Sequence, residues 1–355
     1  MKKVICAVLP VFLLCGCFDS RDVKDVAIVM GISALPGEET YFKTITQTVI
    51  PKGLSKEGDG DSFENFPGEG NHFGECIENT ALKCGKYMYL SHTSALLIHE
   101  DIAKDGIYEI LDYFMRDSEL RSNLTVAVVK SEAEKIMETE SGLLKVPVSG
   151  VASLIRKFRE TSLGSAPRVF DMVSDIMKKD AATLVPILAL DGENVTVNGS
   201  AVFKNGKMTG EISNGEARGV LWLLGKVENG IMTIDFGETT LDIKILQSKS
   251  HIYKEETRLK AEIKCNIGIL RDNYDIVTAY GTEAVKQKIS ETIKSETDAA
   301  LLKLQSMNAD VYGIMDMAYK KGYPPVPFGD ISIEVSAECR IKEAGGILKS
   351  ARSKI

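Results

Sequence analysis

The sequence lacks the short motifs by which many enzymes and metal proteins are identified. Its four histidines show no His-Glu-x-x-His spacing and its cysteines form no Cys-x-x-Cys pair, so we expect no dedicated metal site. No strand-like segment is followed by a glycine-rich phosphate loop, and no Gly-x-Ser-x-Gly elbow is present. These absences disfavour an enzyme, and they lead us to expect neither a metal nor any other cofactor.

A long apolar run is also missing beyond the first 16 residues. No later segment reaches the roughly 18 uninterrupted apolar residues that a membrane-spanning helix needs. The formal net charge is −7, and it becomes −9 when Lys2 and Lys3 are removed with those 16 residues. A chain this acidic has no electrostatic reason to bind nucleic acid or anionic lipid headgroups, so neither is an expected partner.

The amino terminus has the pattern of a lipoprotein signal peptide. Met1, Lys2 and Lys3 form a basic start, and the apolar segment 4–14 is too short to remain as a membrane span. Small residues then precede Cys17, as lipoprotein signal peptidase requires. We therefore expect residues 1–16 to be removed and Cys17 to carry the lipid that anchors the protein to a membrane. The alternative is an ordinary signal peptide with a bystander cysteine.

Four cysteines remain after the lipidation site. Cys76 and Cys84 lie on one face of a predicted helix, and their separation of roughly 12 Å is too long for a disulfide. A bridge between Cys265 and Cys339 is possible, although nothing in the sequence supports it. We expect all four to be free, buried thiols.

The segment 17–190 alternates between strand and helix patterns and predicts an N-terminal α/β region, either one domain or two interleaved ones. Two β-branched segments around a turn predict a hairpin over 25–50. The glycine- and acid-rich segment 52–71 is interpreted as a mobile loop or a variable insertion. The remaining expected elements are helices over 72–86, 100–115 and 148–160, and strands over 87–90, 94–98 and 124–129.

The segment 191–355 predicts a C-terminal α+β domain. Asn205-Gly206 is the strongest short hairpin signal, and it lies between strands expected at 195–203 and 207–211. A helix is expected over 214–224, with the single tryptophan, Trp222, in the core of the domain, and antiparallel strands follow this helix. These cover 231–236, 241–250 and 257–270, and they are followed by helices over 282–305 and 310–320 and a strand over 331–340. The fold class is α+β: a mixed α/β region, then an antiparallel sheet covered by a long helix.

Three of the four histidines allow a specific expectation from their context. His72 and His251 are expected on the surface, and His92, at a strand edge, is expected to have a hydrogen-bonded structural role. No spacing relates these residues or His99 to a metal site.

Taken in order, these segments resemble the Ger(x)C family of spore germination lipoproteins. Phe18 stands where the family usually has tryptophan, and both the acidic segment after Pro51 and Tyr323-Pro324-Pro325 also depart from the family pattern. The residues that carry the resemblance are Cys17 to Arg21, Val26 to Gly31, His92, Ile102 to Ile107, Leu111 to Asp117, Arg121, Gly199 to Lys204, Gly219 and Gln305 to Gly313.

The resemblance implies a non-enzymatic C subunit of a GerA-type nutrient germinant receptor. Such a subunit is expected on the outer face of the spore inner membrane, held by its lipid beside two integral membrane subunits, A and B. A substrate-binding lipoprotein of an uptake system is the alternative, and it predicts two similar lobes around a cleft. A cell-envelope hydrolase is a third hypothesis, and it requires convergent polar residues in a pocket.

Overall fold

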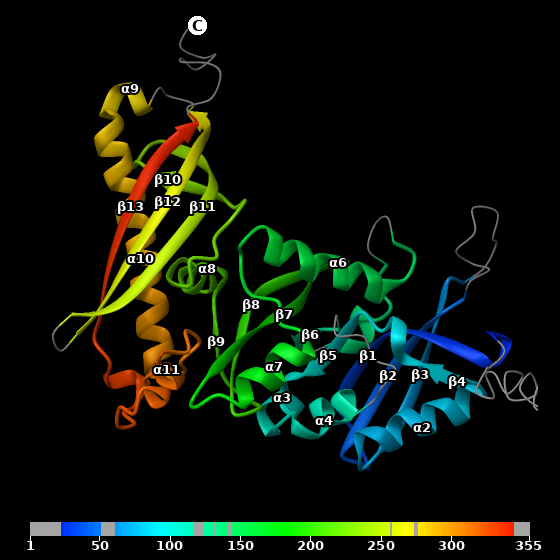
Figure 1. Cartoon of the computed structure of the whole chain (residues 1–355). Helices are drawn as coiled ribbons and strands as arrows, with labels where there is room; N and C mark the ends of the chain where they lie inside the picture. Colours follow the sequence, from blue (N-terminus) through cyan, green and yellow to red (C-terminus); the bar gives the residue numbers. More distant parts are fainter. Residues whose placement is uncertain are drawn as a thin grey trace, which may run out of the picture.

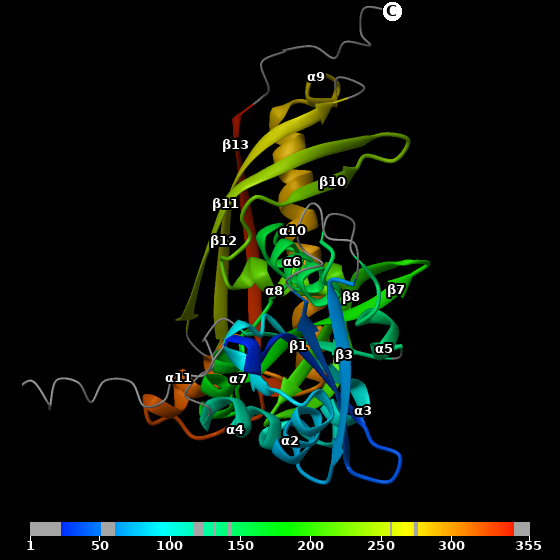
Figure 2. The ribbon, with the colours of Figure 1, turned by 90° about the vertical axis from the view of Figure 1, so that its right-hand side faces the viewer.

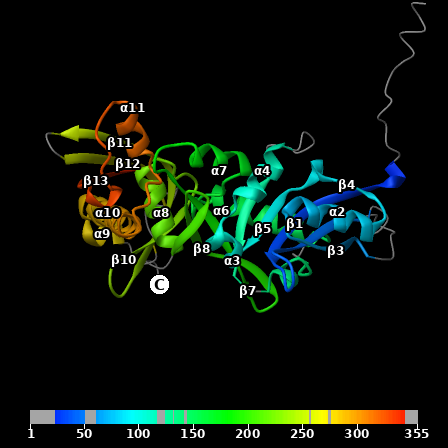
Figure 3. The same cartoon turned by 90° about the horizontal axis from the view of Figure 1, so that it is seen from below.

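The computed structural model describes residues 23–50, 61–116, 124–130, 132–140, 144–255, 258–272 and 276–343. A large sheet with helices on both faces forms one part, and a smaller sheet carrying one long helix forms the other (Figure 1). Seen from below, the two parts lie at opposite ends of an elongated molecule (Figure 3). The α+β fold class predicted from the sequence is confirmed.

The large sheet has nine strands in the order β3-β2-β1-β5-β6-β7-β8-β9, with β4 paired to the start of β1. Strands β1, β5, β6 and β7 run parallel to one another, and the pairs at both edges are antiparallel. The strands are β1 (Val26–Pro36), β2 (Phe42–Val49), β3 (Phe63–Gly70), β4 (Tyr87–Tyr89), β5 (Ala95–His99), β6 (Thr125–Val129), β7 (Ala182–Asp191), β8 (Asn194–Lys204) and β9 (Lys207–Ile212).

Helices cover both faces of this sheet because its central strands are apolar on both sides. In β5, Leu96 and Ile98 pack toward one helix layer, whereas Ala95 and Leu97 pack toward the other. The first layer comprises α2 (Phe73–Cys84), α3 (Glu100–Asp105), α4 (Tyr108–Arg116) and α7 (Val169–Ile176). The second comprises α5 (Ala133–Ile136) and α6 (Pro147–Glu160), on the side where α6 is labelled in Figure 1.

The smaller sheet has the order β10-β11-β12-β13. Helix α10 lies along one face of it, as Figures 1 and 2 show, and buries the stripe predicted from the sequence, including Val285, Ile289 and Ile293. The elements are α8 (Asn214–Leu223), β10 (Ile231–Asp235), β11 (Thr240–Glu255), β12 (Arg258–Asp272), α9 (Ile276–Tyr280), α10 (Thr282–Ser306), α11 (Ile314–Lys320) and β13 (Ile333–Glu343); the short 3-10 turns are η1 (Val23–Asp25), η3 (Leu90–His92) and η4 (Phe328–Asp330).

Three predicted elements differ from the structure. Part of the expected loop 52–71 is the edge strand β3, which pairs with β2 along its whole length. Gly68 makes this possible, because a Cβ there would lie 2.1 Å from the Cys76 carbonyl oxygen of α2, the helix across the strand. The expected helix 100–115 is broken into α3 and α4 at Gly106, whose φ of 141° is open to glycine. The helix expected from residue 310 begins at Ile314.

The closing strand also corrects the predicted topology of the smaller sheet. Strand β13 pairs with β12 in parallel, so the sheet is mixed and not purely antiparallel. A connection through α9, α10 and α11 separates the two strands in sequence, and a parallel pairing requires such a long crossover.

The two sheets share one core. Ala182, Leu184, Val202 and Ile212 of β7, β8 and β9 belong to the same buried apolar cluster as α8, α10 and the smaller sheet. The boundary predicted after residue 190 falls in the β7–β8 hairpin, where Asp191 pairs with Asn194. The large sheet therefore continues through this boundary, and the division into two domains stays a prediction.

Candidate functional site at the junction of the two sheets

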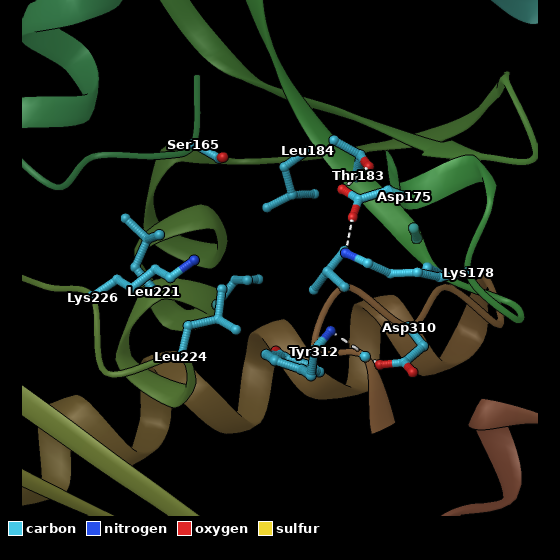
Figure 4. Close-up of a pocket in the computed structure, with 15 residues that line it drawn as sticks. Ser165, Asp175, Lys178, Thr183, Leu184, Leu221, Leu224, Lys226, Asp310 and Tyr312 are labelled. Atoms are coloured by element: carbon cyan, nitrogen blue, oxygen red, sulfur yellow. Dashed lines mark hydrogen bonds and ion pairs between the residues drawn. The ribbon is translucent and has the colours of Figure 1, made fainter. Parts of the chain in front are cut away.

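A cavity of about 260 Å³ lies where the large sheet meets α8 and the loop after α10. Figure 4 shows Thr183 and Asp175 on one side, Leu221 of α8 and the adjoining Leu224 on another, and Tyr312 below Thr183 and Asp175. Its lining is Ser165, Asp175, Lys178, Ala181, Ala182, Thr183, Leu184, Val220, Leu221, Leu224, Lys226, Asp310, Val311, Tyr312 and Gly313. We call this the junction cavity.

Asp310 holds the loop that closes the junction cavity. Its carbonyl oxygen accepts a hydrogen bond from the Ala182 N–H at 2.8 Å, which ties the loop to β7. Its carboxylate accepts from the N–H groups of Tyr312 at 3.0 Å and Met315 at 2.7 Å. Burial raises the pKa of Asp310, and these N–H donors oppose that shift by favouring the charged form. Asp310 thus joins the large sheet to the start of α11.

The other polar groups of the junction cavity are mostly paired. Asp175 accepts from Thr183 Oγ1 at 2.6 Å and lies 2.6 Å from Lys178 Nζ. Within the described part of the chain, the buried Tyr312 hydroxyl has no hydrogen-bond partner, and burial together with the Asp310 charge raises its pKa. No side-chain nucleophile is hydrogen-bonded to a histidine among the lining residues of this cavity. Its polar groups mainly hold the two parts of the molecule together, and one hydroxyl is left without a partner.

Helices α8 and α10 meet at a charged contact beside the junction cavity. Arg218 of α8 donates two hydrogen bonds to the Glu296 carboxylate of α10, one of them at 3.0 Å from Nε. The indole N–H of Trp222 donates to the same carboxylate at 3.0 Å, and Trp222 is fully buried, as predicted from the sequence. Gly219 lies between them, where a Cβ would come 2.2 Å from the Glu296 carbonyl oxygen. Close packing of the two helices depends on this glycine.

Several of the runs that carry the family resemblance converge at the junction. Lys204 Nζ donates to the Asn308 carbonyl at 2.7 Å, so the run ending at Lys204 contacts the run 305–313. The Ile107 N–H donates to the Gly206 carbonyl at 2.9 Å, which brings the run 102–107 to the β8–β9 turn. The sequence did not reveal that these separate runs meet in space, nor the roles of Asp310 and Glu296.

The histidines do not gather at the junction. His72 and His251 are exposed, as predicted. His92 is exposed and contacts the Tyr89 ring. No hydrogen bond to it is found in the described part of the chain, and the hydrogen-bonded role expected for it stays a prediction. His99 accepts from the Asp101 N–H at 3.2 Å and caps α3. Among the described residues, no three histidine, cysteine or acidic side chains lie close enough to hold a metal ion.

The four cysteines of the described chain are free thiols, as expected from the sequence. Cys84 is only half-buried, a correction to its predicted burial, because it is the last residue of α2. Cys265 and Cys339 occupy paired positions of β12 and β13, and the neighbouring Cys339 together with burial raises the pKa of Cys265. Burial also raises the pKa of Cys76, to about 12.

The predicted lipidation site, Cys17, and the resemblance residue Arg121 lie outside the described residues. Of the helices described, none is long and apolar enough to cross a membrane.

Comparison with known proteins gives matches along nearly the whole chain. Residues 19–190 match the family model of the spore germination protein N-terminal domain, and residues 198–345 match that of the spore germination B3/GerAC-like C-terminal domain. Spore germination protein KC of Bacillus subtilis (strain 168) is 24% identical, over 97% of each chain. Spore germination protein A3 of the same organism is 23% identical, over 65% of this chain and 63% of its own.

A solved structure shares the fold. The crystal structure of the GerBC protein superposes with a TM-score of 0.53 at 15% identity, covering 88% of this chain and 96% of its own. The two family models together leave only the chain ends and residues 191–197, at the β7–β8 hairpin, unmatched. The chain therefore belongs to the Ger(x)C family of spore germination proteins, and its role is in spore germination.

Proposed function

We propose that this protein is a lipid-anchored, non-enzymatic subunit of a nutrient germinant receptor and is required to start germination. The observation that carries the proposal is the pair of family matches, which run in order from residue 19 to residue 345. Relatives named as spore germination proteins A3, B3 and KC support the assignment to a receptor with further subunits. The partners we propose are two integral membrane subunits, A and B.

The anchor gives a physical reason for this arrangement. Five residues lie between Cys17 and Val23, and even fully extended this stretch spans only about 20 Å. A lipid on Cys17 would hold Val23, three residues before the start of β1, within that distance of the bilayer, on the outer face of the spore inner membrane. Tethering raises the effective concentration of the protein for membrane-bound partners, so weak contacts suffice for assembly.

The structure offers less support to the alternatives. A substrate-binding protein of an uptake system is expected to have two similar lobes, whereas the two sheets here have nine and four strands with different orders. A hydrolase requires a convergent set of reactive groups, and the polar groups of the junction cavity are mostly engaged in structural hydrogen bonds.

The partner proposal is tested by purification from spores. The full chain, tagged after Ile355, is extracted from spore membranes in a mild detergent, and co-purifying proteins are identified by mass spectrometry. Two polytopic membrane proteins should be enriched over an untagged strain and lost with Cys17→Ala. Cys15→Ala is the matched control, because it removes a thiol from the signal segment and leaves Cys17 intact. Equal recovery of these proteins with Cys17→Ala would contradict anchoring as the basis of assembly.

A further inference from the structure

A second cavity, of about 520 Å³, lies on the α6 side of the large sheet, and its lining residue Ala166 directly follows Ser165 of the junction cavity. Its walls come from four separate segments: the turn before β5, the start of β6, α6 and the residues before α7. We call it the arginine pocket. Its lining is Ser91, His92, Thr93, Ser94, Thr125, Ala152, Arg156, Arg159, Ala166 and Arg168.

The lining of the arginine pocket is positive, although the chain as a whole is acidic. Arg156 and Arg159 are three residues apart on α6, so both guanidinium groups project from the same side of the helix. Neither has an ion pair within the described part of the chain, and none of the lining residues carries a carboxylate. Arg168 is held by two hydrogen bonds of 2.9 Å to Asp171, which fix its position at the rim.

A second feature of the arginine pocket is a buried hydroxyl group in its wall. Thr93 lines the pocket and is only 6% exposed, yet its Oγ1 has no hydrogen-bond partner among the described residues. The neighbouring hydroxyls are engaged: Ser94 Oγ donates to the Met30 carbonyl and Thr125 Oγ1 donates to the Ser94 carbonyl, both at 2.9 Å. An unpaired buried hydroxyl costs free energy, but the Thr93 oxygen is covered by the surrounding protein atoms, so the ligand contacts of the pocket fall to its arginines.

We propose that the arginine pocket binds a phosphate group. Guanidinium groups match the oxygens of phosphate with paired, charge-assisted hydrogen bonds. Within the described part of the chain neither Arg156 nor Arg159 forms an ion pair, although the Asp171 carboxylate also attracts Arg159. Their positive charges can balance the two charges of inorganic phosphate or the single charge of a phosphodiester headgroup.

Two sources of that phosphate share this chemistry, a free phosphate and the headgroup of a phospholipid. A structural argument favours the headgroup, because the pocket wall is hydrogen-bonded to β1, the strand that follows the proposed lipid anchor. Ser94 donates to the Met30 carbonyl of β1 from both its N–H and its hydroxyl. The phosphate proposal itself does not depend on lipidation of Cys17.

The test is calorimetric titration of the full-length lipidated protein in a neutral detergent. The probes are inorganic phosphate, as the free source, and glycerophosphoglycerol, as the headgroup of phosphatidylglycerol without its acyl chains. Arg156→Gln combined with Arg159→Gln should weaken binding by at least about tenfold, because each loses charge-assisted hydrogen bonds. Thr93→Val keeps the side-chain shape and should leave affinity within about twofold, because the Thr93 hydroxyl is covered by protein atoms. Affinity should also fall as salt is raised.

Lys157→Gln is the matched control, because it removes one positive charge from the same helix outside the pocket lining and should leave affinity within about twofold. Binding of inorganic phosphate alone assigns the free source, and stronger binding of glycerophosphoglycerol assigns the headgroup; both support the site. The proposal is overturned if neither probe binds at millimolar concentration, or if the double arginine variant binds as the unmodified protein does. Circular dichroism confirms that each variant is folded.

Discussion

Replacing Gly219 by alanine should test the tight contact between α8 and α10. The added Cβ would lie 2.2 Å from the Glu296 carbonyl oxygen and 2.8 Å from Ala300 Cβ, whereas ordinary contact begins at 3.4 Å. The helices must therefore separate by about 1 Å, which strains a close-packed core by about 1–3 kcal/mol. Separation also weakens the hydrogen bonds of Arg218 and Trp222 to Glu296, worth about 1.5–3 kcal/mol when the acceptor is charged. The gain in helix propensity, about 1 kcal/mol, offsets only part of this.

The expected net effect of Gly219→Ala is a loss of about 2–4 kcal/mol from the free energy of unfolding. Urea unfolding followed by tryptophan fluorescence measures it directly, because Trp222 is the single tryptophan and lies at this contact. Gly215→Ala is the matched control on the same helix: its Cβ would have 3.9 Å to the nearest atom, so it should stabilise by about 0.5–1 kcal/mol. If both variants raised the urea midpoint equally, the close-approach argument would be refuted.

Three further predictions concern other parts of the molecule. Cys84, being half-buried, should be alkylated in the native protein well before the buried thiols Cys76, Cys265 and Cys339. The hydrogen bond to Asp105 raises the pKa of Tyr41 from 10.0 to about 12. The stability of the folded protein should therefore fall as pH rises between these two values, and Tyr41→Phe should remove that fall. Thermal unfolding at each pH measures both. Asp310→Asn keeps one acceptor oxygen but places an amide N–H donor opposite backbone N–H donors. It should lower the free energy of unfolding in urea by about 1–3 kcal/mol. The control, Asp330→Asn at an exposed position, should leave this free energy nearly unchanged.

The parts of the fold that the sequence predicted are those specified by local patterns. The apolar stripe of α10 and the alternation of β12 are periodic, and both bury the residues expected. The Asn205-Gly206 turn has φ of 49° and 66°, the left-handed geometry that this pair favours in a two-residue hairpin. Each of these features is decided by neighbouring residues, so the pattern alone sufficed.

The elements that the sequence missed depend on distant partners. Strand β7 contains Pro186, which argues against a strand, yet the ladder to β8 shifts register just after this residue and the proline is accommodated. Strand β3 has the composition of a loop and is formed by pairing with β2. The parallel pairing of β13 with β12 is a matter of topology, which periodicity does not encode.

The sequence did not predict the candidate sites, because they too depend on contacts between distant segments. Asp310 lies within one of the runs that carry the family resemblance, but its hydrogen bond to Ala182 joins segments far apart in sequence. The overall charge pointed away from anionic ligands, whereas the fold gathers Arg156, Arg159 and Arg168 into one pocket without a lining carboxylate. The spacing of Arg156 and Arg159 was the single signal in the sequence that pointed to this face of α6.

The central claim is that this protein starts germination as a membrane-tethered receptor subunit. The measurement that tests it most directly is nutrient-induced germination of spores that lack the gene, complemented with the unmodified protein, Cys17→Ala or Cys15→Ala at matched protein levels. Deletion should abolish the response to at least one nutrient. The unmodified protein and Cys15→Ala should restore that response, and Cys17→Ala should not. Normal germination of the deletion spores with every nutrient would contradict the claim.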